Sequence, residues 1–215
     1  LLVSVDCIVL GFEDKKLKLL VGKRKVEPGR GKLSLYGGFV RQDESLKEAA
    51  NRVLYQCTGI CDNYIRQVGA FGDIDRDPGD RVISIAYCAL TNVADYDKNL
   101  LTRYDLKWVD LNKLPALYGD HIEMVRLALA QLRKLLNTEP ISFNLLPHLF
   151  TLTQLQHVHE AILGVEIDKR NFRKKIKLID FIERTELIDK VTSKRGAALY
   201  RFNRKTYKNS PTFKL

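Results

Sequence analysis

The chain has 215 residues, of which 45% are hydrophobic and 29% are charged, a composition typical of globular proteins with one or two domains. Most of its net charge of +10 comes from residues 141–215, which hold 15 Lys and Arg against 7 Asp and Glu, whereas residues 1–140 hold 21 against 19. No apolar run approaches the roughly 20 residues that cross a bilayer, and the N-terminal segment has no basic leader, so we expect a cytoplasmic protein without a membrane span or a signal peptide.

The first elements along the chain are two apolar stretches, residues 1–12 and 17–25, that flank a charged turn. This pattern predicts a β-hairpin, which places the charged residues 13–16 at its tip. Three later stretches also have strand patterns: 64–73, 81–92 and 106–109.

Helical spacing of apolar residues predicts helices over residues 44–57 and 120–136. The polar segment 137–140 follows the second helix and contains Pro140, at the point where the basic composition begins. We therefore predict two domains, residues 1–139 and 140–215.

The second domain has the element order of a winged helix. A helix is expected to begin at Thr153, which has capping-box spacing to Gln156, and to end near Gly164. Asp168 is expected to cap a second helix over residues 169–180. Strands are predicted over 187–191 and 197–202, on either side of a basic tip.

Residues 38–60 read GFVRQDESLKEAANRVLYQCTGI. Their spacing resembles the Nudix box, G-x5-E-x7-R-E-U-x-E-E-x-G-U, in which U is aliphatic. The matching positions are Gly38, Glu44, Arg52, Leu54, Gly59 and Ile60. The resemblance covers roughly residues 1–136 and implies an α+β fold: a Nudix-like α/β/α sandwich with a mixed sheet, followed here by a winged helix-turn-helix domain.

The three glutamates of the family's metal-binding segment are replaced in this chain by Val53, Gln56 and Cys57. Mg²⁺ needs carboxylate or water oxygens, which these residues do not supply, so we expect no bound metal, no catalytic residue and no enzymatic hydrolysis. The four cysteines lack the spacing of a zinc site, and we expect no cofactor. A Nudix hydrolase that takes carboxylates from elsewhere is the alternative, with these candidates: Asp73, Asp75, Asp77 and Asp80.

Residues 168–179 read DKRNFRKKIKLI and place an apolar stripe beside a cationic one. Such a helix suits the major groove, where Arg pairs with guanine, Asn reads adenine and Lys contacts phosphates. The predicted DNA-binding residues are Lys169, Arg170, Asn171, Arg173, Lys174 and Lys177 on the helix, with Lys194 and Arg195 on the wing. A solvated basic surface and an RNA-binding protein are the alternatives.

Residues 150–156 and 168–175 resemble the C-terminal domain of Nudix-related transcriptional regulators, and the two domains together account for nearly the whole chain. The resemblance implies a homodimer that binds operator DNA and a small-molecule effector. The overall likeness is closest to arabinose-responsive repressors, so we expect a repressor of L-arabinose or pentose catabolism that its effector releases from DNA. An ADP-ribose-sensing regulator of NAD metabolism and a Nudix hydrolase acting on a nucleoside diphosphate compound are the alternatives. Candidate effector-binding residues are Asp6, Arg24, Lys32 and Tyr36.

Overall fold

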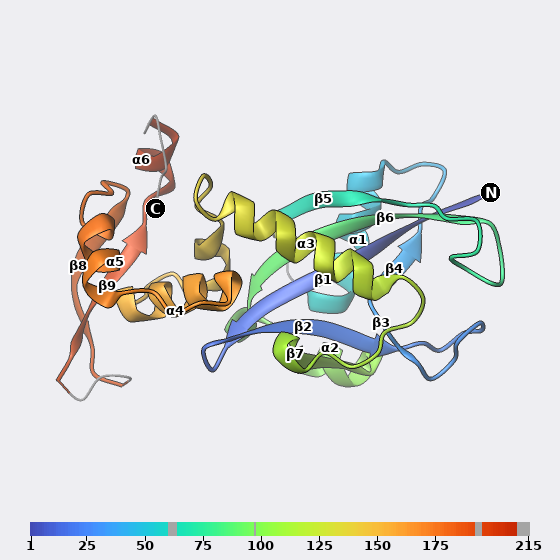
Figure 1. Cartoon of the computed structure of the whole chain (residues 1–215), viewed down its shortest axis with the longest axis horizontal. Helices are drawn as coiled ribbons and strands as arrows, with labels where there is room; N and C mark the ends of the chain where they lie inside the picture. The colour runs from blue at the N-terminus through green and yellow to red at the C-terminus, as the bar shows by residue number, and fades with distance from the viewer. Residues whose placement is uncertain (60–63, 97, 192–194, 210–215) are drawn as a thin grey trace.

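The computed structural model describes residues 1–59, 64–96, 98–191 and 195–209 (Figure 1). Its N-terminal domain is built on a seven-stranded mixed sheet with the main order β3-β2-β1-β6-β5, to which β4 adds at β1 and β7 at β2. The strands are β1 (Leu2–Glu13), β2 (Lys16–Lys23), β3 (Leu33–Ser34), β4 (Tyr36–Phe39), β5 (Tyr64–Phe71), β6 (Val82–Asn92) and β7 (Leu106–Asp110). The parallel pair β1–β6 and the antiparallel pair β1–β2 make the sheet mixed, as the sequence predicts.

Alternate residues of β1 face opposite sides of the sheet, because side chains of a strand alternate with a period of two. Ile8 and Leu10 pack toward α3 (His121–Leu135), whereas Cys7 and Val9 pack toward α1 (Leu46–Thr58). The two helices therefore cover opposite faces of one sheet (Figure 1). The predicted α/β/α sandwich is confirmed.

The predicted helices over 44–57 and 120–136 and the predicted hairpin are present within a few residues of their expected bounds. Several short elements have no strong sequence pattern and were not expected. They are β3, β4, α2 (Lys98–Tyr104), α6 (Arg204–Asn209) and the 3₁₀ turns η1 (Val93–Asp95), η2 (Leu111–Lys113) and η3 (Ile141–Leu145).

The C-terminal domain is a winged helix. After η3 it contains α4 (Leu152–Leu163) and α5 (Lys169–Ile176), followed by the antiparallel strands β8 (Ile182–Asp189) and β9 (Ala197–Phe202). Helix, helix and hairpin follow in the predicted order. Gly164 ends α4 in the left-handed conformation and Asp168 caps α5 through the Asn171 N–H, both as predicted.

Three predicted bounds in this domain are wrong. The capping box of α4 is formed by Thr151 and Gln154, two residues before the predicted pair, because the bridge between Phe150 and Tyr200 fixes the chain just before the helix. Helix α5 ends at Ile176. Beyond it, the N–H groups of Leu178 and Ile179 each donate to the carbonyl oxygen three residues earlier, which tightens the chain into turns. Strand β8 begins at Ile182 because that residue pairs with Phe202, earlier than its polar sequence suggests.

One apolar core runs through both domains. Leu132 and Leu136 at the end of α3 belong to the same cluster as Ile141, Leu145 and Leu155 of the winged helix. In addition, the Arg133 guanidinium donates to the carbonyl oxygen at the end of α4 over 2.9 Å. Helices α3 and α4 are therefore joined by both apolar packing and a hydrogen bond. Within the described residues, no helix is long and apolar enough to cross a membrane.

The buried imidazole of His159 is expected to make stability depend on pH. His159 is 3% exposed, lies 3.1 Å from the Ser142 hydroxyl, and burial lowers its pKa to about 4. Between pH 6.5 and 4 the unfolded chain binds a proton there that the folded chain does not, so stability falls as the pH falls. From pH 7 to pH 5 this residue should remove about 2 kcal/mol of unfolding free energy.

Urea unfolding at the two pH values measures this loss, with His159→Gln as the comparison because Gln can still hydrogen bond to Ser142. Burial also lowers the pKa of His121 and His157, so wild type and variant will both lose stability on acidification. The wild type should lose more than the variant. Equal losses in the two proteins would show that His159 does not carry the effect.

Candidate functional site

Helix α1 carries most of the Nudix-like box, and the glutamates just before it and in its first turn, Glu44 and Glu48, are engaged in structural contacts. The Ser45 hydroxyl accepts from the Glu48 N–H while the Glu48 carboxylate accepts from the Ser45 N–H, which completes a capping box. Glu44 is paired with Arg52 and accepts from the Arg41 N–H at 2.9 Å. The hydrogen bond from Arg52 is the main reason why the pKa of Glu44 falls to about 2.

The residues at the family's metal-ligand positions do not fit Mg²⁺. Val53 is 1% exposed and belongs to the core beneath α1. Cys57 is fully buried, and burial raises the pKa of its thiol to about 12, so it remains a neutral thiol. Gln56 is exposed but offers only a neutral amide. Within the described residues, no group of three or more His, Cys, Asp or Glu side chains is arranged to hold a metal ion.

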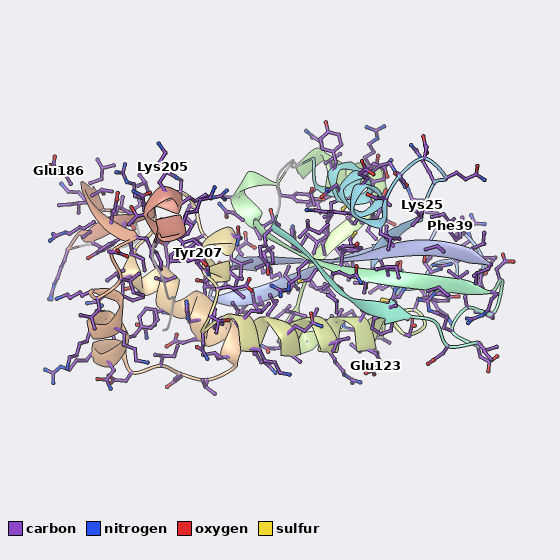
Figure 2. All side chains as sticks on the ribbon, turned by 90° about the horizontal axis from the view of Figure 1, so that it is seen from above. Lys25, Phe39, Glu123, Glu186, Lys205 and Tyr207 are labelled. Atoms are coloured by element: carbon purple, nitrogen blue, oxygen red, sulfur yellow. The ribbon has the colours of Figure 1, made fainter. Side chains whose placement is uncertain are left out.

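A cavity of about 600 Å³, here called the box cavity, lies where the Nudix-like box begins. Three of the four predicted effector residues line it: Asp6 from β1, Arg24 just after β2, and Tyr36 from β4. Lys32 is exposed, its carbonyl oxygen accepts from the Arg24 N–H, and it is not among the described residues that line the box cavity. Figure 2 shows Lys25 and Phe39, which also line it, at the opposite end of the molecule from Glu186 and Lys205 of the winged helix.

Asp6 is the buried carboxylate at the floor of the box cavity. It accepts a hydrogen bond from the Ser84 hydroxyl, and its oxygens lie 3.9 Å from Arg76 and 3.8 Å from the His121 Nε2. Gly37 is its partner on β4, where a Cβ would lie 2.3 Å from the Asp6 Oδ1, so only glycine leaves the carboxylate room. Several polar groups therefore surround a carboxylate that an apolar strand would otherwise leave without partners.

Arg76 and His121 complete the polar side of the box cavity, although sequence reasoning did not select them. The Arg76 side chain is 7% exposed and donates to both Asp120 carboxylate oxygens, over 2.9 and 2.8 Å. The His121 Nδ1 accepts from the Leu35 N–H, and burial lowers the pKa of this imidazole, so the neutral ring presents Nε2–H toward Asp6. A charged residue in a loop and a histidine at a helix start are too common to single out these two positions.

The mouth of the box cavity is cationic and aromatic. The Arg24 guanidinium lies 4.1 Å above the centre of the Tyr118 ring and donates to the Pro28 carbonyl oxygen. Lys23 and Lys25 line the same mouth. Cations and buried hydrogen-bond acceptors together suit a ligand that carries both phosphates and sugar hydroxyls. Of the four loop carboxylates proposed for an alternative hydrolase, Asp77 and Asp80 also line the cavity, while Asp73 and Asp75 do not.

The basic face of α5 is exposed, as a nucleic-acid contact requires. Phe172 and Ile176 are buried and hold the helix against the rest of the winged helix. The six helix residues predicted to contact DNA are exposed: Lys169, Arg170, Asn171, Arg173, Lys174 and Lys177. Arg195 is exposed near the wing tip, whereas Lys194 lies outside the described residues. This surface presents cations that are not buried against the N-terminal domain.

The comparisons with known proteins match both domains. The NUDIX domain model matches residues 1–128, and the model of the NrtR DNA-binding winged helix domain matches residues 142–202. A relative named ADPR responsive transcriptional repressor NtrR, from Acinetobacter baylyi, is 33% identical over 211 residues, which are 96% of this chain and 84% of that protein. The solved structure of Shewanella oneidensis NrtR complexed with a 27mer DNA is 29% identical, with a TM-score of 0.85, and the match covers 96% of this chain and 95% of that chain.

Two further matches concern the N-terminal domain. A structure of the NUDIX domain of the Shewanella protein complexed with ADP ribose is 28% identical, with a TM-score of 0.51, over 61% of this chain and 88% of that chain. An ADP-ribose pyrophosphatase of Methanocaldococcus jannaschii is 34% identical over 124 residues, which are 58% of this chain and 70% of that enzyme. The expected control of arabinose or pentose catabolism is wrong, because the matching regulator responds to ADPR. The likeness to sugar regulators rested on the shared pair of domains and not on residues of the cavity.

Proposed function

Because the chain belongs to the family that joins a NUDIX domain to an NrtR DNA-binding winged helix domain, we propose that it is a transcriptional repressor that senses ADP-ribose. ADP-ribose would bind in the box cavity and release the protein from operator DNA. The observation that carries this proposal is a cavity that keeps cations and buried hydrogen-bond acceptors while Val53 and Cys57 occupy metal-ligand positions inside the core.

The effector is assigned to the box cavity by its chemistry. Arg24 and its neighbouring lysines match the pyrophosphate, and Asp6 can accept hydrogen bonds from ribose hydroxyls. Tyr36 is the other predicted contact kept in this proposal. Hydrolysis is not part of the proposed function, since the box lacks the carboxylates that would hold and bridge a catalytic metal.

DNA binding is assigned to α5 and the wing. The six exposed helix residues named above and Arg195 are the proposed contacts, which a homodimer would place on two half-sites of an operator. We also propose that the division of the chain into residues 1–139 and 140–215 separates sensing from DNA binding. Release requires ADP-ribose to bind more tightly to the conformation that fits DNA less well, and α3 connects the two sites through the shared core.

A thermal-shift measurement in EDTA tests the effector. ADP-ribose at about 100 times its dissociation constant adds about 2.7 kcal/mol of stability, which for a chain of this size raises the melting temperature by about 5–10 °C. L-Arabinose at the same concentration serves as the control and should leave the melting temperature unchanged. A shift with L-arabinose and none with ADP-ribose would refute the assignment.

A further inference from the structure

The β1–β2 hairpin extends from the box cavity to the winged helix. Asp6 and Gly22 lie at the cavity end of its two strands, whereas Phe12 and Lys15 lie at the other end, beside α4 (Figure 1). At roughly 3.3 Å per residue, the strand from Asp6 to the turn spans about 25–30 Å. Helix α4 packs directly on β2. The hairpin is thus a part of the N-terminal domain that reaches both proposed sites.

The turn of the hairpin forms one wall of a groove of about 1090 Å³, here called the interdomain groove. The opposite wall carries Lys169, Arg173 and Lys177, which lie on the groove side of α5. Thr153 and Gln154 from the first turn of α4 also line the groove. The N-terminal domain therefore shares a groove with three of the five cations proposed to contact DNA from α5 and its C-terminal end.

Lys15 is the cation that the turn offers to this groove. The carboxylates of Glu13 and Asp14 are both paired with Lys18, and Lys16 is paired with Asp110. Lys15 is exposed and forms no ion pair within 4.0 Å in the part of the chain that the structure describes. Its charge is close enough to α4 to contribute, after burial, to the lowered pKa of His157, which lines the same groove.

The backbone holds Lys15 at a defined position. Asp14 and Lys15 have φ values of 51° and 62°, and Glu13 pairs with Lys16 across the strands. Two consecutive residues in the left-handed region form the tight turn whose twist matches a β-hairpin. The position of the Lys15 backbone is therefore set by the sheet that also forms the box cavity.

We propose that Lys15 binds a backbone phosphate of the same DNA duplex that α5 contacts. The proposal rests on the proposed DNA-binding function and adds a contact from the effector-binding domain itself. Three α5 cations and Lys15 face one groove, and the neighbouring acidic side chains of the turn, Glu13 and Asp14, both contact Lys18 and not Lys15. A displacement of the hairpin by a ligand at its cavity end would move this contact.

The test measures binding of the full chain to one duplex, selected from a random library by the wild type, at several salt concentrations. One phosphate contact contributes a slope of about 0.9 to the dependence of log affinity on log salt. Lys15→Ala should therefore flatten the slope by about 0.9 per chain and weaken binding about five- to tenfold at about 0.1 M salt. Lys15→Arg should keep the wild-type slope.

Lys47→Ala is the matched control, because Lys47 is exposed on α1, on the N-terminal domain but outside the groove. It should bind as the wild type does. A purely structural role of Lys15 beside α4 would lower the melting temperature of Lys15→Ala without changing its salt slope, and this result would overturn the proposal. If Arg173→Ala weakens binding while Lys15→Ala does not, only the Lys15 contact fails. If the wild type selects no duplex, the proposed function fails together with it.

Discussion

Replacing Arg76 with leucine is expected to destabilise the fold by about 3 kcal/mol and to abolish the response to ADP-ribose. The Arg76 side chain is 7% exposed and is bonded to both oxygens of Asp120. Its loss leaves Asp120 without that partner and removes the positive charge 3.9 Å from buried Asp6. Removing one partner of a buried ion pair costs far more than removing a surface pair, because the remaining charge stays desolvated.

Arg126→Leu is the control for this prediction. Arg126 forms an ion pair with Glu123 on α3, but its side chain is 67% exposed, so its loss should change stability by less than about 1 kcal/mol. Urea unfolding and ADP-ribose thermal shifts compare the two variants. Similar small losses in both would mean that the Arg76 network does not organise the box cavity.

Replacing Arg173 with alanine is expected to weaken operator binding by about 5- to 150-fold, equivalent to about 1–3 kcal/mol, and to relax specificity at one base position. Arg173 is exposed on α5 and lies 3.5 Å from the Thr153 hydroxyl, so its guanidinium is held near the start of α4. Fluorescence anisotropy with the selected duplex and its single-base variants measures both effects.

Arg126→Ala again provides the comparison, since it removes an exposed arginine of the N-terminal domain and should leave affinity unchanged. Unfolding curves should show that Arg173→Ala is as stable as the wild type, because Arg173 contributes nothing to the apolar core. Unchanged operator affinity in Arg173→Ala would mean that the recognition face on α5 is assigned wrongly.

Elements with a strong local signal could be predicted from the sequence. The box around Gly38 and Arg52 predicted helix α1. The apolar stripe of Phe172 and Ile176 predicted which side of α5 is buried. The start of α4 was mistaken because Thr151 and Thr153 both have a glutamine three residues later. The tertiary bridge between Phe150 and Tyr200 selects the first of these two caps, and no local pattern encodes that bridge.

Only some of the residues that line the box cavity could be predicted from the sequence, for a similar reason. Asp6 could be selected because a carboxylate within an apolar strand needs a partner. Its neighbours Arg76 and His121 come from a loop and from the start of α3, and they meet Asp6 only through the fold. The expected sugar effector failed for the same reason, because it was inferred from the pair of domains before the side chains that line the cavity were known.

The proposed repressor binds ADP-ribose without cleaving it and releases DNA in response. The most direct test adds ADP-ribose and Mg²⁺ to the full chain bound to a fluorescent operator duplex, follows anisotropy, and then quantifies the nucleotide by chromatography. We predict that anisotropy falls to the value of the free duplex and that the ADP-ribose is recovered intact. Retention of the duplex at saturating ADP-ribose, or cleavage of the ADP-ribose pyrophosphate at an enzymatic rate, would refute this function.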